Sequence, residues 1–350
     1  MRILITGGAG LVGSHAAAYF SKKEHDVIVF DNLGRSSLFK SDRSSVEFNW
    51  EFLSQVKGVS RIIGDIRSES DLNHAMSGGI DAVIHAAGQP GVSFSIKNPH
   101  EDFSINAFGT LNVLEAARKQ KAKIFIYCST NKVYGENVCK VPLVEKETRY
   151  ELANLRGIAE DFPLDLTAHT PYGVSKYTGD LYVQEYGHLF GMRTAVFRMS
   201  CIYGSRQFGF EDQGWVAWFL IAALTHQKIT IFGDGKQVRD ILYVTDLIRA
   251  YENFILSDLP NGVFNIGGGA SFTLSLLELL DFIRKNGVTP DFSYTDWRPS
   301  DQKVYISDIS KIKKLLKWEP LVPPQEGLTR LADWISKNLH LFTEKMVSKT

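Results

Sequence analysis

The chain has 350 residues, which is enough for roughly two domains or for one large α/β domain with an added lobe. Its 39 Lys and Arg residues balance its 39 Asp and Glu residues, so no net charge points to nucleic acid or an anionic membrane as a partner. No apolar run approaches the roughly 18 to 20 residues of a membrane span, and Met1 leads directly into a strand-like segment, so we expect a cytoplasmic protein that does not bind a membrane.

Short apolar segments alternate with helical patterns in the first half of the chain. The sequence predicts strands over residues 2–6, 26–31, 60–65, 81–88, 123–129 and 194–200, and helices over 14–21, over 109–119 and from residue 172. This alternation is typical of an α/β fold with a doubly wound parallel (Rossmann) sheet that carries helices on both faces.

The composition changes in the second half of the chain. Residues 136–170 lack periodicity, so we expect a long loop, which in compact domains usually has a function. Beyond residue 211, Gly and aromatic residues become frequent, with strands predicted over 228–232 and 263–268 and helices over 275–285 and 327–337. We therefore predict a first domain over 1–198, a smaller α/β lobe over 199–340 that shares elements with it, and a tail over 341–350.

Neither a metal site nor a disulfide is indicated. The three cysteines, Cys128, Cys139 and Cys201, form no CxxC pair, and the nine histidines show no HxxxH or HExxH spacing. We therefore expect reduced thiols and no metal.

A glycine-rich segment, TGGAGLVG, follows the first predicted strand and opens a helix. Gly7, Gly10 and Gly13 would allow a tight turn and a close approach of the backbone to a pyrophosphate at the helix N-terminus. Asp31 ends the next strand, where a carboxylate binds the adenosine ribose hydroxyls and repels the additional phosphate of NADP. NAD is therefore the expected cofactor, although Arg35 leaves NADP open.

Other residues at the carboxyl edge of the predicted sheet complete the expected cofactor site. Ligands of open α/β sheets bind at this edge. The further residues predicted to bind the cofactor are Leu11, Val12, Asn32, Asp65, Ile66, Ala86, Ala87, Gly88, Asn106, Ser129, Tyr172 and Lys176.

Two further motifs indicate a site of proton transfer. The segment CSTNKVYG ends an apolar strand in Ser129, Thr130 and Asn131, which by itself is more typical of strand termination than of a functional site. Downstream, PYGVSK places Tyr172 and Lys176 four residues apart on one helix face, where an ammonium group lowers the pKa of a neighbouring phenol. Together with a dinucleotide fold, these residues predict that Thr130 binds a reacting alcohol oxygen and that Tyr172 takes its proton.

The glycine turn, the YxxxK pair and the strand-end hydroxyls resemble the extended short-chain dehydrogenase/reductase superfamily, and in particular its nucleotide-sugar epimerases and dehydratases. The similarity runs from residue 1 to about 335. It implies that Thr130, Tyr172 and Lys176 form the catalytic triad, with Asn131 beside them. It also implies contacts with a nucleotide sugar from Ser200, Thr130, Arg206, Gln213, Arg239, Tyr243, Arg298 and Asp301.

Within this superfamily, the residues after the catalytic threonine separate the reactions. Dehydratases carry an Asp and a Glu there, whereas this chain has Asn131 and Lys132, so 4,6-dehydration is not expected. The segments TNKVYG and EDQGWVAWF resemble epimerases that convert CDP-paratose to CDP-tyvelose by inversion at C2, in lipopolysaccharide O-antigen biosynthesis. The resemblance also implies a homodimer or homotetramer.

Two other functions stay open at this point. A UDP-hexose 4-epimerase would use the same triad and cofactor groove, and would differ in the pocket around Ser200, Cys201 and Gln213. A regulatory protein that binds NAD without catalysis would be expected to have lost part of the triad, yet Thr130, Tyr172 and Lys176 are all present.

Overall fold

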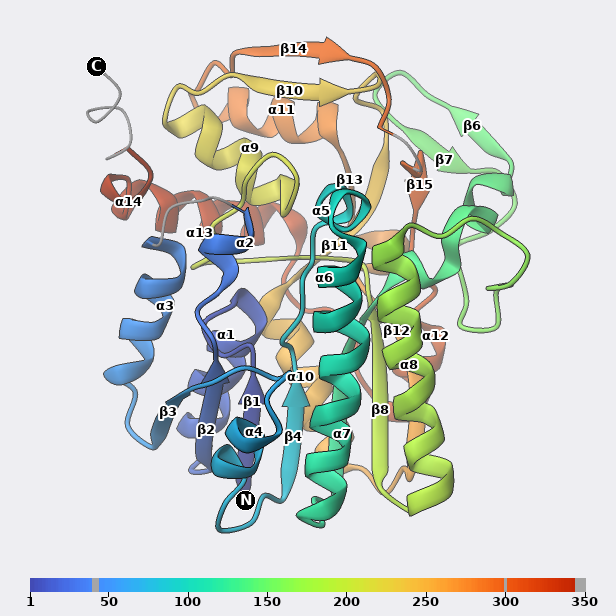
Figure 1. Ribbon diagram of the computed structural model, residues 1–350. Helices are drawn as coiled ribbons and strands as arrows, with labels where there is room; N and C mark the ends of the chain where they lie inside the picture. Colours follow the sequence, from blue (N-terminus) through green and yellow to red (C-terminus); the bar gives the residue numbers. More distant parts are fainter. Residues whose placement is uncertain (40–43, 299–300, 344–350) are drawn as a thin grey trace.

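The main sheet of the protein has seven parallel strands (Figure 1). The computed structural model describes residues 1–39, 44–298 and 301–343. From edge to edge the strands are β12 (Asn261–Ile266), β8 (Arg193–Met199), β5 (Ile124–Thr130), β4 (Ala82–His85), β1 (Arg2–Thr6), β2 (Asp26–Asp31) and β3 (Val59–Ile63). The chain winds outward in opposite directions from β1 and β4, which creates a switch point between them. The predicted doubly wound parallel sheet is therefore confirmed.

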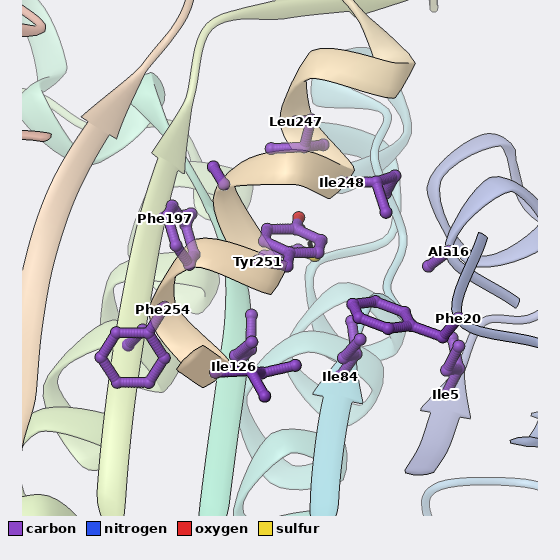
Figure 2. Close-up of a cluster of buried hydrophobic side chains, with 14 of the residues drawn as sticks. Ile5, Ala16, Phe20, Ile84, Ile126, Phe197, Leu247, Ile248, Tyr251 and Phe254 are labelled. Atoms are coloured by element: carbon purple, nitrogen blue, oxygen red, sulfur yellow. Dashed lines mark hydrogen bonds between the residues drawn. The ribbon is translucent and has the colours of Figure 1, made fainter. Parts of the chain in front are cut away.

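One face of this sheet is covered by α1 (Leu11–Lys22) and α10 (Val244–Leu256). Figure 2 shows Phe20 of α1 and Tyr251 and Phe254 of α10 against strand residues such as Ile84 and Ile126. These five side chains are almost completely buried. Each one contributes about 1.5–3 kcal/mol through removal of apolar surface from water, so this layer anchors the second half of the chain to the sheet.

The opposite face is covered by α4 (Glu69–Ala75), α7 (Gly109–Lys119) and α8 (Pro171–Phe190).

The bounds of α8 follow from local chemistry. The Thr170 side chain accepts a hydrogen bond from the Gly173 N–H at 3.3 Å, and Pro171 occupies the first helical position. Gly191 ends the helix in the left-handed conformation that glycine adopts without strain. This fixed start places Tyr172 in the first turn of α8.

A second lobe lies beyond the carboxyl ends of the main sheet (Figure 1). In it β11 (Val238–Tyr243) pairs with β9 (Cys201–Tyr203), β13 (Thr273–Ser275) and β15 (Val304–Tyr305), and β10 (Ile229–Phe232) pairs with β14 (Phe292–Thr295). Its helices are α9 (Trp215–Leu224), α11 (Leu276–Lys285) and α13 (Pro324–Lys337). Because β12 belongs to the main sheet, the chain returns to that sheet after it has entered the second lobe. The division into two domains after residue 198 stays a prediction.

Shorter elements connect these layers. They are α2 (Arg35–Phe39), α3 (Ser44–Ser54), α5 (Val92–Lys97), α6 (Pro99–Phe103), the π-helix η1 (Ser104–Phe108), the 3-10 helix η3 (Gly269–Ser271), α12 (Ser310–Leu316) and α14 (His340–Thr343). Most of the predicted tail, residues 344–350, lies outside the described residues. No helix in the described part of the chain is long and apolar enough to span a membrane.

The segment expected to be a long loop, residues 136–170, contains regular structure. It begins within the 3-10 helix η2 (Asn131–Lys140), and β6 (Leu143–Glu145) pairs with β7 (Tyr150–Leu152) as a short antiparallel hairpin. Ile158, which is completely buried, forms a bridge with Ser307 next to β15. The expectation of an uninterrupted loop was wrong because strands of three residues are too short to produce a periodic pattern.

Candidate active site

The glycine segment between β1 and α1 forms a turn with no room for side chains. Gly7 has a φ of +71°, and a Cβ at this position would meet the backbone of Ala86 and Ala87 at 2.6–2.8 Å. A Cβ on Gly13 would lie 2.2 Å from the Gly7 carbonyl oxygen. The turn therefore brings backbone rather than side chains to the start of α1, where free N–H groups and the helix dipole favour a phosphate.

A cavity of about 370 Å³ lies at the switch point, in front of this turn. Its wall combines the carboxyl ends of the central strands with residues of the second lobe. Of the residues predicted from the sequence to bind the cofactor, it includes Gly7, Gly10, Leu11, Val12, Gly13, Asp31, Asn32, Asp65, Ile66, Ala86, Ala87, Gly88, Ser129 and Tyr172.

Asp31 lies at the end of β2 and faces the glycine turn. Its carboxylate accepts hydrogen bonds from the Ala9 N–H at 2.9 Å and from the Leu33 N–H at 2.8 Å. Burial raises the pKa of Asp31, and these two hydrogen bonds oppose that change because they stabilise the ionised form. The structure thus supplies a buried acceptor where ribose hydroxyls can donate.

Asp65 forms a second acidic position on the same wall. Its carboxylate accepts hydrogen bonds from Arg67 and, at 2.9 Å, from Asn32. Burial opposes ionisation, but these bonds are stronger and hold the pKa of Asp65 at about 2. Asn32 and Asp65 therefore give this part of the cavity wall a fixed, charged hydrogen-bond network.

Arg35, the residue that left NADP open, is engaged with the second lobe. Its guanidinium donates to the Gln213 side chain at 2.6 Å and to the Phe208 carbonyl at 3.0 Å. It also lies 5.9 Å from the Phe39 ring centre and 5.7 Å from that of Phe210. Arg35 also lines the cavity, but its guanidinium is already hydrogen-bonded to the second lobe, which favours NAD over NADP.

Replacing Asp31 with Ala is expected to weaken NAD binding by about 10-fold to 100-fold relative to NADP, because charged hydrogen bonds contribute about 1.5–3 kcal/mol each. Fluorescence titration of cofactor-free protein with each dinucleotide measures this ratio. Asp26→Asn is a matched control, since Asp26 is an exposed carboxylate at the opposite end of the same strand. An unchanged preference in Asp31→Ala would contradict the role given to this carboxylate.

Thr130 and Tyr172 line the same cavity. Thr130 is the last residue of β5, and Tyr172 lies in the first turn of α8. The Thr130 hydroxyl accepts a hydrogen bond from the Lys132 N–H at 3.2 Å, which fixes its direction. Two hydroxyls on the wall of one cavity offer a site at which an alcohol can be bound and deprotonated.

Lys176 lies one turn further along α8 and is 6% exposed. Its ammonium group lies 4.3 Å from the centre of the Tyr127 ring, and a Cβ on Gly88 would come within 3.7 Å of it. Lys176 itself does not line the cavity. It therefore lies behind Gly88, on the cofactor side of the two hydroxyls.

The protonation equilibria of this pair differ from the sequence-based expectation. Burial raises the pKa of Tyr172 to about 12, and burial lowers the pKa of Lys176 to about 8. Lys176 was expected to lower the Tyr172 pKa, but desolvation is the larger effect in the cofactor-free protein. A further positive charge beside the phenol would favour the phenolate, and the nicotinamide ring of NAD carries one.

Several predicted residues support the site from behind. The Ser129 hydroxyl donates to Asp180 of α8 at 2.8 Å, which ties the end of β5 to the helix that carries Tyr172. Asn106 holds the backbone of Gln89 from both sides, at 2.8 and 3.0 Å. Asn131 accepts a hydrogen bond from Thr130 at 3.4 Å and does not line the cavity.

The predicted substrate residues fall into three groups. Ser200 and Gln213 line the cavity together with Thr130, although the Ser200 hydroxyl already donates to Asp240. Three others are ion-paired: Arg239 binds Asp301 at 2.9 Å, and Arg298 binds Asp212 at 3.0 Å.

Arg206 and Tyr243 lie outside the cavity wall. The Arg206 guanidinium lies 4.1 Å from the centre of the Phe52 ring, and Tyr243 is buried with its hydroxyl 3.0 Å from that of Ser205. Neither side chain lines the cavity in this structure: Arg206 packs on Phe52 of α3, and Tyr243 belongs to the core of the second lobe.

Several lining residues were not singled out from the sequence. They come from separate elements without a shared motif, so only the fold brings them to the cavity. Most of them are apolar, and they include Leu38, Phe39, Val46, Ile202 and Gln207.

The fold and the glycine turn together define a dinucleotide-binding enzyme of the Rossmann class. The family model described as "NAD dependent epimerase/dehydratase family" matches residues 3–267, and the chain belongs to this family. It is an isomerase that uses NAD as its cofactor. The glycine turn fits NAD because it leaves no room for a side chain at Gly7 or Gly13, so backbone alone faces the cofactor.

Known relatives extend over nearly the whole chain. CDP-paratose 2-epimerase of Salmonella typhi is 39% identical and covers 96% of this chain and 99% of the relative. A putative UDP-glucose 4-epimerase of Methanocaldococcus jannaschii is 32% identical with the same coverage. The solved UDP-glucuronic acid 4-epimerase of Bacillus cereus, in complex with UDP-glucuronic acid and NAD, superposes with a TM-score of 0.80 at 29% identity, covering 97% of this chain and 100% of that one.

Proposed function

We propose that the protein is a nucleotide-sugar epimerase that inverts C2 of a CDP-linked deoxyhexose, converting CDP-paratose to CDP-tyvelose through a 2-keto intermediate. The observation that carries this proposal is that Thr130 and Tyr172 line the same cavity as the glycine turn. Similarity to the Salmonella typhi 2-epimerase supports the choice of carbon and nucleotide.

Each residue of the triad then has a defined task. Tyr172 takes the proton of the C2 hydroxyl, and Thr130 hydrogen-bonds the same oxygen as negative charge develops on it. Lys176 supplies a positive charge behind Gly88, which favours the phenolate form of Tyr172. Bound NAD supplies the acceptor for the C2 hydride and gives it back, so the reaction consumes no cofactor.

The residues after Thr130 favour epimerisation over dehydration. Elimination of water from a sugar needs an acid and a base placed beside the keto group. Asn131 is an amide, and Lys132 is an amine whose pKa burial lowers to about 8. Neither residue therefore supplies the carboxylic acid and carboxylate pair. Asn131 instead accepts a hydrogen bond from the Thr130 hydroxyl at 3.4 Å and so supports Thr130 from behind the cavity wall.

The second candidate is a 4-epimerase acting on a UDP-linked hexose. It is favoured by the Thermotoga maritima UDP-glucose 4-epimerase structure with UDP-glucose, which superposes with a TM-score of 0.79 at 30% identity, covering 97% of this chain and 100% of that one. The two candidates share triad and cofactor. They differ only in how the cavity wall at Ser200, Cys201 and Gln213 presents the sugar.

Proton NMR separates the two candidates. Purified protein is incubated with CDP-paratose, CDP-glucose and UDP-glucose in separate samples, and the ring coupling constants are followed. We expect inversion at C2 of a CDP-sugar. Inversion at C4 of UDP-glucose, with no change in either CDP-sugar, would contradict the assignment of substrate and carbon.

We also propose a homodimer through α8 and the adjoining helices, as the resemblance implies. Apolar side chains 42–65% exposed lie on α6, η1 and α8: Phe103, Phe108, Val174, Leu181, Tyr182, Leu189 and Phe190. Sedimentation velocity of the native protein tests this proposal, and a monomer at micromolar concentration would contradict it.

The cytoplasmic location expected from the sequence stays a prediction.

A further inference from the structure

A buried carboxylate that the proposed chemistry does not use lies beside the catalytic pair. Asp102 belongs to α6 and is 1% exposed. Its helix packs against α8, which carries Tyr172 and Lys176. No Lys or Arg within the described ranges forms an ion pair with Asp102. Burial raises the pKa of Asp102, whereas its hydrogen bonds and the charge of Lys176 favour the ionised form. A carboxylate kept in such a buried position calls for a function.

The hydrogen bonds of Asp102 connect it to the wall of the cofactor cavity. One carboxylate oxygen accepts from the Gln89 side-chain amide at 2.7 Å and from the Asn106 amide at 3.1 Å. The other oxygen has no hydrogen-bond partner among the described residues. Gln89 directly follows Gly88, and Asn106 holds the Gln89 backbone, so Asp102 orients the segment that separates Lys176 from the cavity.

The other groups around Lys176 leave Asp102 as the unpaired negative charge. Asp180, on the same helix as Lys176, is bound to Arg198 at 2.9 Å. Burial raises the pKa of Cys128 on β5 to about 11 and lowers that of His85 on β4 to about 3, so both are neutral near pH 7. The ring of Tyr127 carries no charge.

We infer that Asp102 is a positioning residue of the catalytic pair, whose carboxylate orients Gln89 and Asn106 beside Gly88 and whose charge stabilises the ammonium form of Lys176; the inference rests on the proposed roles of Tyr172 and Lys176. The same charge disfavours the phenolate of Tyr172. Asp102 thus sets the pH range in which a charged Lys176 and a reactive Tyr172 occur together.

Asp102→Asn is expected to shift the pH profile of kcat to lower pH by about one unit, since a nearby charge changes a pKa by about 1–3 units. Loss of the negative charge lowers the pKa of Lys176, because the ammonium form loses a stabilising partner. It also lowers the pKa of Tyr172, because the phenolate loses a repelling neighbour. Both limbs of the profile therefore move in the same direction, whereas a purely structural defect would lower kcat without moving them.

Glu101→Gln is the matched control. Glu101 is the preceding residue of α6, is half-exposed and is paired with Arg67 at 2.8 Å, so its variant should keep the wild-type profile. Asp102→Glu keeps the charge and should restore the wild-type pH optimum. If Asp102→Asn does not fold, Asp102→Ser removes the same charge with a smaller side chain.

The outcomes separate this inference from the proposed function. A folded neutral variant with an unshifted profile would overturn the role of Asp102 while Tyr172→Phe stays inactive. If Tyr172→Phe is itself active on the nucleotide sugar, the proposed function fails irrespective of the Asp102 result.

Discussion

Tyr172→Phe is expected to lower the rate of epimerisation by about 10²-fold to 10⁴-fold, the usual contribution of a positioned general base. The substitution removes one oxygen atom and keeps the ring, so the wall of the cavity is retained. The residues of the glycine turn and Asp31 are unchanged, and the protein should keep its NAD. Turnover is measured by NMR and bound NAD by absorbance after denaturation.

Tyr177→Phe is the matched control for this variant. Tyr177 lies on the same helix, packs against His169 and does not line the cavity. It should turn over substrate at the wild-type rate. Equal turnover rates for Tyr172→Phe and Tyr177→Phe would show that Tyr172 is not the general base.

Asp180→Asn is expected to destabilise the protein by about 3–5 kcal/mol, because it leaves the charge of Arg198 buried without its partner. The side chains of this pair are 0% and 4% exposed, and their closest atoms are 2.9 Å apart. Asp180 also accepts the hydrogen bond of Ser129 at 2.8 Å, so the loss should loosen the end of β5 that carries Thr130. Urea-induced unfolding measures the change in free energy.

Two comparisons make this prediction specific. Asp281→Asn breaks the exposed pair with Lys285 on α11 and should cost roughly 0–1 kcal/mol. The double variant Asp180→Leu with Arg198→Met removes both buried charges and should be more stable than Asp180→Asn, since no unpaired charge remains. If Asp180→Asn unfolds within 1 kcal/mol of wild type, the pair does not hold β5 and α8 together.

The parts of the site that rest on short segments could be predicted from the sequence. The glycine turn is one example, because strand, turn and helix follow one another and place Gly7 and Gly13 without reference to distant residues. The pairing of Tyr172 with Lys176 is another, since the helical repeat alone puts both on one face. The carboxyl ends of parallel strands share one edge of the sheet, so Thr130, at the end of its strand, could be predicted to lie near the glycine turn.

Other features depend on contacts between distant segments and left no local pattern. Ser129 lines the cavity, as its prediction as a cofactor-binding residue requires, but only the fold shows that its hydroxyl donates to Asp180, 51 residues away. Arg35 suggested NADP, but its partner is Gln213 in the second lobe. The balance between burial and charge at Tyr172 also needs the folded structure, because desolvation depends on every group packed around the phenol.

In the proposed reaction, the C2 hydrogen leaves as hydride and returns to the same carbon within one active site. This return can be followed with CDP-paratose deuterated at C2, incubated with the purified protein in ordinary water. We predict that the CDP-tyvelose formed keeps its deuterium at C2, as seen by NMR. Product with hydrogen at C2 would show exchange with solvent and would contradict hydride return.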